Sequence, residues 1–190
     1  MISHMTTENE IKILDIDKEK AERTLLELGF IKQEPQEFCR YTYDQEGSRE
    51  GCWHRLRTDG KKTTITHKSF KKDVINGVQE LEIVVDNFEK AHEMLLLLGL
   101  KEASFQENRR QRYLLGSVEV SIDEWPLIPA YLEIEAPTKE DVEKYLLKLN
   151  SDDKRTTSEL TPYVYSLYGY RLDSYKHLAF ESQSNYLIAT

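Results

Sequence analysis

The 190-residue sequence has only two cysteines, no long apolar run and no excess of positive charge. Cys39 and Cys52 do not form a CxxC pattern, so we expect reduced thiols and a cytoplasmic location. The longest apolar run, residues 94–98, is far shorter than the roughly 20 residues that span a bilayer, so no membrane partner is expected. A formal charge of −8 argues against a protein that coats DNA or RNA, because a phosphate backbone selects a positive surface.

The chain is nevertheless long enough and aromatic enough to bury a core. It contains 11 Tyr, 6 Phe and 2 Trp, and its length fits one domain, which we expect over residues 6–180. Residues 1–5 resemble a sequence added by cloning in front of a native Met5, and residues 181–190 are expected to form a loose tail.

A repeated pattern predicts three amphipathic helices. Residues 8–30 and 80–100 each contain an ExE strand followed by a helix that ends in Leu-Gly, and residues 133–150 form a partial third copy. Each helix is expected to begin after a residue that can cap its N-terminus: Asp17, Asp86 or Thr138.

Turn signals divide much of the remaining chain into strands. Asp59-Gly60 predicts a two-residue type I′ turn between strands 53–58 and 61–68. A second hairpin joins residues 109–115 to 118–125, and residues 131–135 follow as a further strand. The tyrosine-rich segment 163–180 is expected to pack back as short helices, through a core contact or a homodimer contact.

The polar side chains of these strands fall on one face, because residues two apart share a face of a strand. The alternate positions are mainly Ile, Leu and Val, which the three helices can cover. The polar face is expected to contain Glu8, Glu10, Lys12, Arg55, Arg57, Lys62, Lys68, Glu80, Glu82, Asn108, Arg110, Arg112, Glu119, Asp123, Glu133 and Glu135.

Such a face is more ionic than an ordinary solvated sheet, in which Glu and Lys are depleted. Eight carboxylates and seven cations gathered in this way must pair or bind a ligand. Clustered carboxylates suit Mg²⁺ or Mn²⁺, and rows of Arg and Lys suit phosphate. The residues therefore favour a small polyphosphate with a divalent metal, and not a nucleic-acid polymer.

The same residues resemble a known family. Glu8-x-Glu10-x-Lys12 is similar to the ExExK signature of the CYTH superfamily, the triphosphate tunnel metalloenzymes. Further family positions follow in the expected order: Arg55-x-Arg57, Lys68, Glu80-x-Glu82, Arg110, Asp123 and Glu133-x-Glu135. The end of the chain, residues 174–180, is similar to that of class IV adenylyl cyclases.

This resemblance implies an α+β fold, a closed eight-stranded antiparallel β-barrel forming a tunnel with a charged lumen and helices outside. It implies Glu8, Glu10, Glu133 and Glu135 as metal ligands for Mg²⁺ or Mn²⁺. The substrate-binding set it implies is Lys12, Arg55, Arg57, Lys68, Glu80, Glu82 and Arg110, with Arg112 as an added cation. Asp123 would be a tunnel carboxylate near the reactive end, and Lys12 would act as a base or as a phosphate ligand.

The function implied is a metal-dependent enzyme that acts on a triphosphate, either an adenylyl cyclase or a triphosphatase. One position departs from the family pattern, because Asn108 stands where a Lys is usual. A non-catalytic module that binds a polyphosphate or nucleotide is therefore the alternative.

His54 and His67 fall on the apolar side of their strands and are assigned to packing or the surface.

Overall fold

The computed structural model describes residues 9–44, 52–70, 78–150 and 153–180, without the side chains of residues 68–70 and 78–80. The chain divides into two compact units. The first unit contains Glu37–Glu107 and the segment that starts at Asp173, and the second contains Thr7–Gln36 and Asn108–Leu172. The single domain expected over residues 6–180 stays a prediction.

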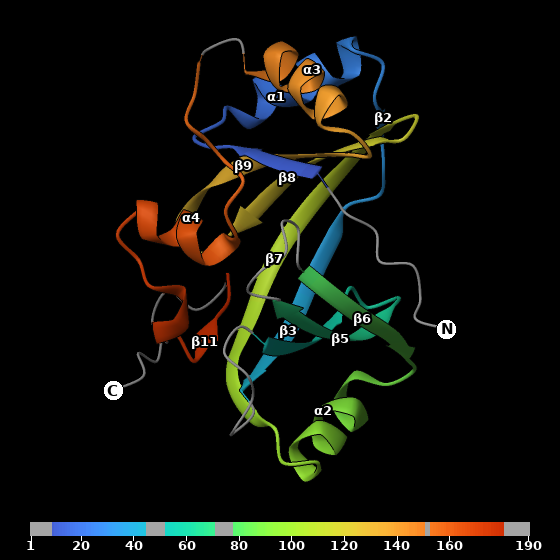
Figure 1. The fold of residues 1–190 in the computed structure, drawn as a ribbon, viewed down its shortest axis with the longest axis vertical. Helices are drawn as coiled ribbons and strands as arrows, with labels where there is room; N and C mark the ends of the chain where they lie inside the picture. Colours follow the sequence, from blue (N-terminus) through green and yellow to red (C-terminus); the bar gives the residue numbers. More distant parts are fainter. Residues whose placement is uncertain (1–8, 45–51, 71–77, 151–152, 181–190) are drawn as a thin grey trace. The chain divides into compact units, whose positions relative to one another are not determined.

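The second unit is an antiparallel sheet with helices (Figure 1). Its strands pair in the order β10-β1-β9-β8-β7, and β2 also pairs with β7. The strands are β1 (Asn9–Ile13), β2 (Ile31–Lys32), the end of β7 (Lys101–Leu115), β8 (Val118–Trp125), β9 (Ile128–Ala136) and β10 (Thr156–Thr157). The helices are α1 (Lys18–Glu27), α3 (Lys139–Leu149) and α4 (Thr161–Leu167), and a short 3₁₀ turn, η1 (Leu172–Ser174), begins at the unit's end.

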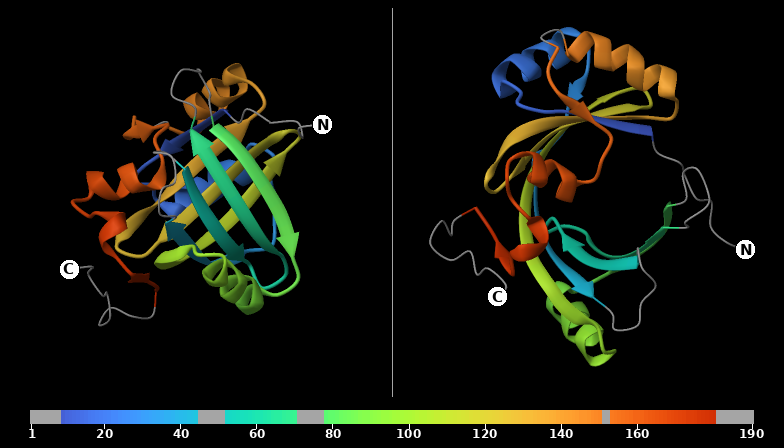
Figure 2. Two further views of the ribbon diagram at one scale, coloured as in Figure 1. Left: turned by 60° about the horizontal axis from the view of Figure 1, so that its bottom comes forward. Right: turned by 60° about the vertical axis from the view of Figure 1, so that its left-hand side comes forward.

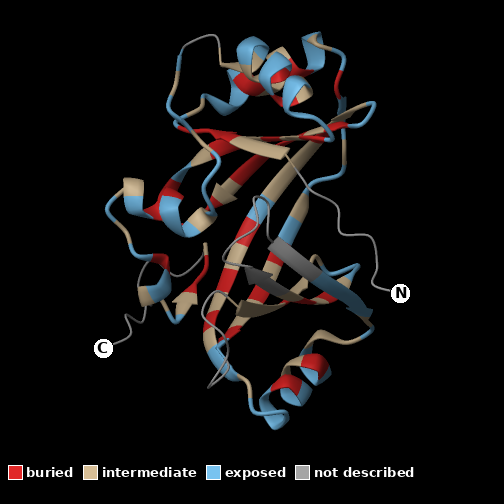
Figure 3. Ribbon diagram, in the orientation of Figure 1, coloured by how far each residue is buried: buried red, intermediate tan, exposed pale blue. Residues whose placement is uncertain are grey.

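The helices α1 and α3 cover the apolar face of this sheet, as the sequence predicted (Figures 2 and 3). Leu25 of α1 and Tyr145 of α3 are buried in one cluster with the strand residues Ile13, Val120 and Ile134. Burying this face leaves the opposite face of the same strands for the charged side chains.

The first unit is a second antiparallel arrangement, ordered β7-β3-β4-β5-β6. Its elements are β3 (Gln36–Asp44), β4 (Cys52–Thr58), β5 (Thr63–Phe70), β6 (Val78–Val85), α2 (Phe88–Leu97), the start of β7 and β11 (His177–Leu178), which pairs with β7 in parallel. Ala91 and Leu95 of α2 pack against Tyr43 and Leu56, so this helix also covers an apolar sheet face.

Closure of the sheet into the expected eight-stranded barrel stays a prediction. Among the described residues, eight strands have five or more residues, and the hydrogen-bonded order runs from the short β10 through β1 to β6. Along the part of β1 formed by Lys12 and Ile13, one edge pairs with β9 and the other with β10. These two residues of β1 are therefore paired on both edges, whereas Asn9, Glu10 and Ile11 pair with β9 alone.

The hairpin of β4 and β5 differs from the prediction by two residues. Thr58 pairs with Thr63, so the connection contains four residues and not two. The Asp59 carboxylate accepts hydrogen bonds from the backbone N–H groups of Lys61 and Lys62, at 3.0 and 2.7 Å, and this widens the turn. The polar and apolar faces are unchanged, because a shift of two residues preserves alternation.

The three predicted helices are present, with one corrected cap. Asp17 and Thr138 accept hydrogen bonds from Lys20 and Asp141, as expected. The cap of α2 is Asn87 and not Asp86, because the Asn87 side chain accepts from the backbone N–H of Lys90 at 2.8 Å.

Other expectations concern the end of the chain and its surroundings. Tyr165 of α4 is fully buried and donates to the backbone oxygen of Pro126 at 2.7 Å, which confirms its core position.

Cys39 and Cys52 are free thiols. Within the described ranges, no helix has the length and apolar character needed to cross a bilayer. The tail at residues 181–190 and the segment 1–5 lie outside the described residues.

Candidate functional site

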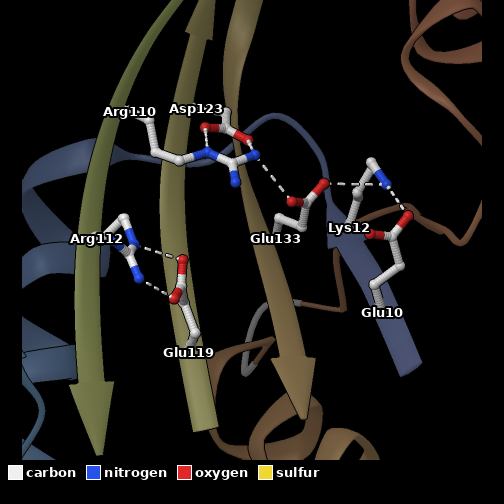
Figure 4. Close-up of polar contacts among 7 residues, drawn as sticks. All are labelled: Glu10, Lys12, Arg110, Arg112, Glu119, Asp123 and Glu133. Atoms are coloured by element: carbon white, nitrogen blue, oxygen red, sulfur yellow. Dashed lines mark hydrogen bonds and ion pairs between the residues drawn. The ribbon is translucent and has the colours of Figure 1, made fainter. Parts of the chain in front are cut away.

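A chain of alternating charges runs across the polar face of the second unit (Figure 4). Arg110 donates from Nε and Nη2 to the two oxygens of Asp123, both at 2.6 Å, and from Nη2 to Glu133 at 2.9 Å. The other Glu133 oxygen lies 3.1 Å from Lys12 Nζ, which also donates to Glu10 at 2.9 Å. Strands β1, β9, β8 and β7 thus each contribute to one continuous network.

The sheet register explains why these residues meet. Lys12 lies directly opposite Glu133, and Arg110 lies directly opposite Asp123. Opposed residues of an antiparallel pair have Cβ atoms about 5 Å apart, within reach of charged side chains. Arg112 instead reaches diagonally to Glu119, and its Nε and Nη2 donate to the two oxygens at 2.7 and 2.5 Å.

Lys12 and Asp123 of this network are deeply buried, whereas Glu10 and Arg110 are 29% and 25% exposed. Only 2% of the Lys12 side chain and none of the Asp123 side chain are exposed. Burial alone lowers the pKa of Lys12, but the carboxylates of Glu133 and Glu10 outweigh it and raise that pKa. Burial raises the pKa of Glu133, yet Arg110 and Lys12 bring it below its ordinary value.

A row of three carboxylates crosses the same face. Glu10 lies opposite Glu135 on β9, and Glu135 lies opposite Glu119 on β8. Like charges that face each other across strands are destabilising, and a hard divalent cation would relieve this repulsion. The chemistry of the donors therefore fits Mg²⁺ or Mn²⁺, although no group of three ligating side chains converges on one point within the described part of the chain.

The polar face of the first unit carries arginines and threonines. Arg55 donates to Thr66 Oγ1 at 3.3 Å, and Thr66 donates to Glu82 Oε2 at 3.1 Å. The guanidinium of Arg57 lies 4.8 Å from the ring centre of Phe38. Burial raises the pKa of Glu82, but the Thr66 hydrogen bond and the charges of Arg57, Lys62 and Arg55 lower it overall.

Sequence reasoning missed one arginine of this face. Arg40 on β3 lies directly opposite Arg57 on β4 and is 8% exposed. The turn signals in the sequence assign no strand to residues 36–44, although the alternation of their side chains is typical of one. Phe38 and Arg40 share one face, and Tyr41 and Tyr43 share the other.

Four further residues were predicted on the charged face: Glu8, Lys68, Glu80 and Asn108. Glu8 lies outside the described residues, as do the side chains of Lys68 and Glu80. The backbones of Lys68 and Glu80 lie opposite each other in the pair of β5 and β6. Asn108, at the usually basic position, is 3% exposed on β7. Its burial leaves little room for solvent at this point of the strand.

His54 and His67 lie opposite each other because of the longer β4–β5 turn. His54 Nε2 and His67 Nδ1 are 2.9 Å apart, on the apolar side where the sequence had placed both residues. Burial and the charge of His67 lower the pKa of His54. These histidines therefore belong to the packing of the strands and not to the charged face.

Comparisons with known proteins agree with this arrangement. A protein of Methanocaldococcus jannaschii, provisionally named an adenylate cyclase, is 30% identical over 141 residues, which is 72% of this chain and 81% of the relative. A Vibrio parahaemolyticus structure with the same provisional name has a TM-score of 0.69 at 13% identity and covers 86% of this chain and 99% of its own.

A third likeness is to a Hippeastrum protein, provisionally named an adenylyl cyclase and described as having a dominant triphosphatase activity. Its TM-score is 0.58 at 15% identity, over 84% of this chain and 96% of that protein. At these identities the two structures show a shared fold. The family model described as the CYTH domain matches residues 6–157. With the charged strands in the order expected of that family, the chain belongs to the CYTH domain family.

Proposed function

We propose that this protein is a divalent-metal-dependent enzyme that cleaves a triphosphate, as an adenylyl cyclase or as a triphosphatase. The observation that supports this most is the charged face of the second unit in a chain of the CYTH family. On its described strands, five carboxylates accompany three cations: Glu10, Glu119, Asp123, Glu133 and Glu135 with Lys12, Arg110 and Arg112. An assembly this ionic suits a metal-bearing polyphosphate.

The metal ligands in this proposal are the carboxylates of β1 and β9. Glu10 and Glu135 are directly opposed, and Glu133 lies two residues from Glu135 on the same face of β9. Glu8 is proposed with them on the ExExK pattern alone. Mg²⁺ or Mn²⁺ at these oxygens would neutralise charge on the phosphate oxygens of the substrate.

The phosphate ligands in this proposal are the cations that the sequence pattern assigned. Arg55 and Arg57 offer planar guanidinium groups that can bind phosphate oxygens in pairs, and Lys68 is proposed with them. Arg110 and Arg112 are each held in a fixed orientation by a bidentate carboxylate. A guanidinium oriented in this way loses little conformational entropy when it binds.

The structure favours one of the two roles left open for Lys12. A general base must lose its proton near neutral pH, but Glu133 and Glu10 raise the pKa of Lys12. We therefore propose that Lys12 stays charged and binds phosphate. Asp123 is fully buried against Arg110, so we propose that it positions this arginine near the reacting phosphate.

Product identification tests the reaction. The protein is incubated with ATP, tripolyphosphate or thiamine triphosphate, each with Mg²⁺ or Mn²⁺. Cyclic AMP with pyrophosphate identifies attack by the ribose 3′-hydroxyl on the α-phosphorus, and free phosphate identifies attack by water on the terminal phosphorus. Absence of any product with every substrate and metal would contradict an enzymatic function.

A non-catalytic binding module is the second candidate, because Asn108 replaces a basic residue on the charged face. The missing cation would weaken charge neutralisation in the transition state more than binding itself. Tight binding of tripolyphosphate by calorimetry without turnover would favour this candidate. Restored turnover in Asn108→Lys would show that the missing cation at this position is the reason why the wild type binds without turnover.

A further inference from the structure

Two imidazole groups meet on the apolar face of the first unit. His54 on β4 and His67 on β5 occupy directly opposed positions, and His54 Nε2 lies 2.9 Å from His67 Nδ1. The ring centres are 4.7 Å apart and the ring planes are inclined by 44°, so the two nitrogens make the contact and the rings are not stacked. Both residues are partly buried.

The separation of the two nitrogens fits a shared metal ion. Two imidazole nitrogens that each lie about 2.0–2.1 Å from one Zn²⁺ are roughly 3 Å apart. Without an ion, the contact is a hydrogen bond and one of the two nitrogens must carry a proton. His54 Nδ1 is buried and has no hydrogen-bond partner among the described residues, so no contact at Nδ1 holds the His54 proton on Nε2.

The charge state and the surroundings of the pair also suit a ligand role. Burial and the charge of His67 lower the pKa of His54, so this ring is neutral at pH 7 and can offer a lone pair. Leu81 lies opposite His67 on β6 and is 62% exposed. The pair is therefore close to solvent, from which an ion and a water molecule can enter.

Cys52 is in position to supply a third ligand. Within the described part of the chain, no third Cys, His, Asp or Glu already converges on the pair. Cys52 is a partly buried free thiol that lies two residues before His54 on the same face of β4, diagonal to His67. Diagonal neighbours of a sheet are about 7–8 Å apart, so rotation about the Cα–Cβ bond can turn the sulfur toward an ion between them.

We propose that His54, His67 and Cys52 bind one transition-metal ion of the Zn²⁺ class, with water as the fourth ligand. Nitrogen and sulfur donors select such ions, whereas Mg²⁺ and Mn²⁺ prefer the oxygens of carboxylates. The ion would join β4 to β5 on the face opposite to Arg55 and Arg57. The site uses none of the residues assigned to the triphosphate, so the inference does not depend on the proposed function.

Calorimetry with Zn²⁺ tests this inference. The metal-free full chain is titrated in an excess of Mg²⁺, which competes for the carboxylate oxygens. We expect one Zn²⁺ per chain, with affinity at least 100-fold weaker in His54→Gln and in His67→Gln and at least tenfold weaker in Cys52→Ser. The matched controls His177→Gln and Cys39→Ser, which alter β11 and β3, should stay within twofold.

The absorption spectrum of the Co²⁺-loaded protein is a second measurement. Co²⁺ occupies zinc sites, and a thiolate bound to it absorbs in the near ultraviolet by charge transfer. This absorption should be present in the wild type and in Cys39→Ser and absent from Cys52→Ser. It still tests the site if a histidine variant does not fold by circular dichroism.

Three results would overturn the inference. The first is a wild type that binds no Zn²⁺ in the presence of Mg²⁺. The second is wild-type affinity in any one of the three ligand variants. The third is an equal loss of affinity in the ligand variants and in the controls, because the effect would then not belong to this site.

Discussion

At the scale of single residues, the two bidentate arginine pairs of the second unit differ in burial. Asp123 is fully buried and its partner Arg110 is 25% exposed, whereas Glu119 and Arg112 are 23% and 35% exposed. Removing one partner of a buried pair leaves an uncompensated charge, and exposed pairs contribute little. Although both pairs are bidentate, removing Asp123 should therefore lower the free energy of unfolding more than removing Glu119.

We expect Asp123→Ala to lower the free energy of unfolding by about 3 kcal/mol or more. Glu119→Ala, the matched control, should lower it by about 1 kcal/mol or less. Urea unfolding of both variants measures the difference. Equal losses would show that burial does not determine the strength of these pairs.

The ion pairs of Glu133 also predict that the free energy of unfolding depends on pH. Its folded-state pKa lies below the ordinary 4.5, so the unfolded chain binds more protons as the pH falls. The stability from Glu133 is complete above about pH 4.5 and is lost as the pH falls through the folded value.

Glu133→Gln tests this direction. In EDTA, the variant should be less stable than the wild type at pH 7 by about 3 kcal/mol, and the difference should shrink below pH 4.5. Unfolding curves at several pH values measure it. A difference that stays constant, or grows in acid, would contradict the assigned charge state.

At the scale of elements, the N-cap of α2 gives a direct comparison of neighbours. Asn87 caps the helix, and Asp86 precedes it. Asn87→Ala should lower the free energy of unfolding by about 1 kcal/mol, whereas Asp86→Ala should change it by less than about 0.5 kcal/mol. Thermal or urea unfolding measures both, and the reverse order would move the cap to Asp86.

Periodicity predicted the helices and the faces of the strands, because both depend on local sequence alone. Glu10, Lys12, Arg110, Asp123 and Glu133 all lie on the expected polar face of the second unit. Register was less predictable, since it depends on turn geometry. A two-residue turn at Asp59 would place His54 opposite Ile65, and the wider turn places it opposite His67.

Two features required tertiary information. The pairing of the short β10 with β1 could not be predicted, because β10 lies far along the chain and carries no strong strand signal. The partners of each charged residue were also beyond prediction. Alternation assigns a side chain to a face, whereas only the register shows that Glu133 joins Lys12 to Arg110.

At the scale of the whole molecule, charge differs between the units. Carboxylates outnumber cations on the described polar face of the second unit, and arginines gather on β3 and β4 of the first. This distribution supports a division of labour in the proposed enzyme. The carboxylates would supply the metal ligands, and the arginines and lysines would supply the phosphate ligands.

The central claim is that the charged residues of the polar strand faces act on a metal-bound triphosphate. Metal-dependent turnover by Glu10→Ala, Glu135→Ala and Arg57→Ala, measured beside the charge control Arg23→Met, tests it most directly. We predict that each of the first three loses at least 100-fold in kcat/KM with an unchanged fold by circular dichroism, and that the control stays within twofold. Wild-type turnover in Arg57→Ala, or in both glutamate variants, would contradict the account.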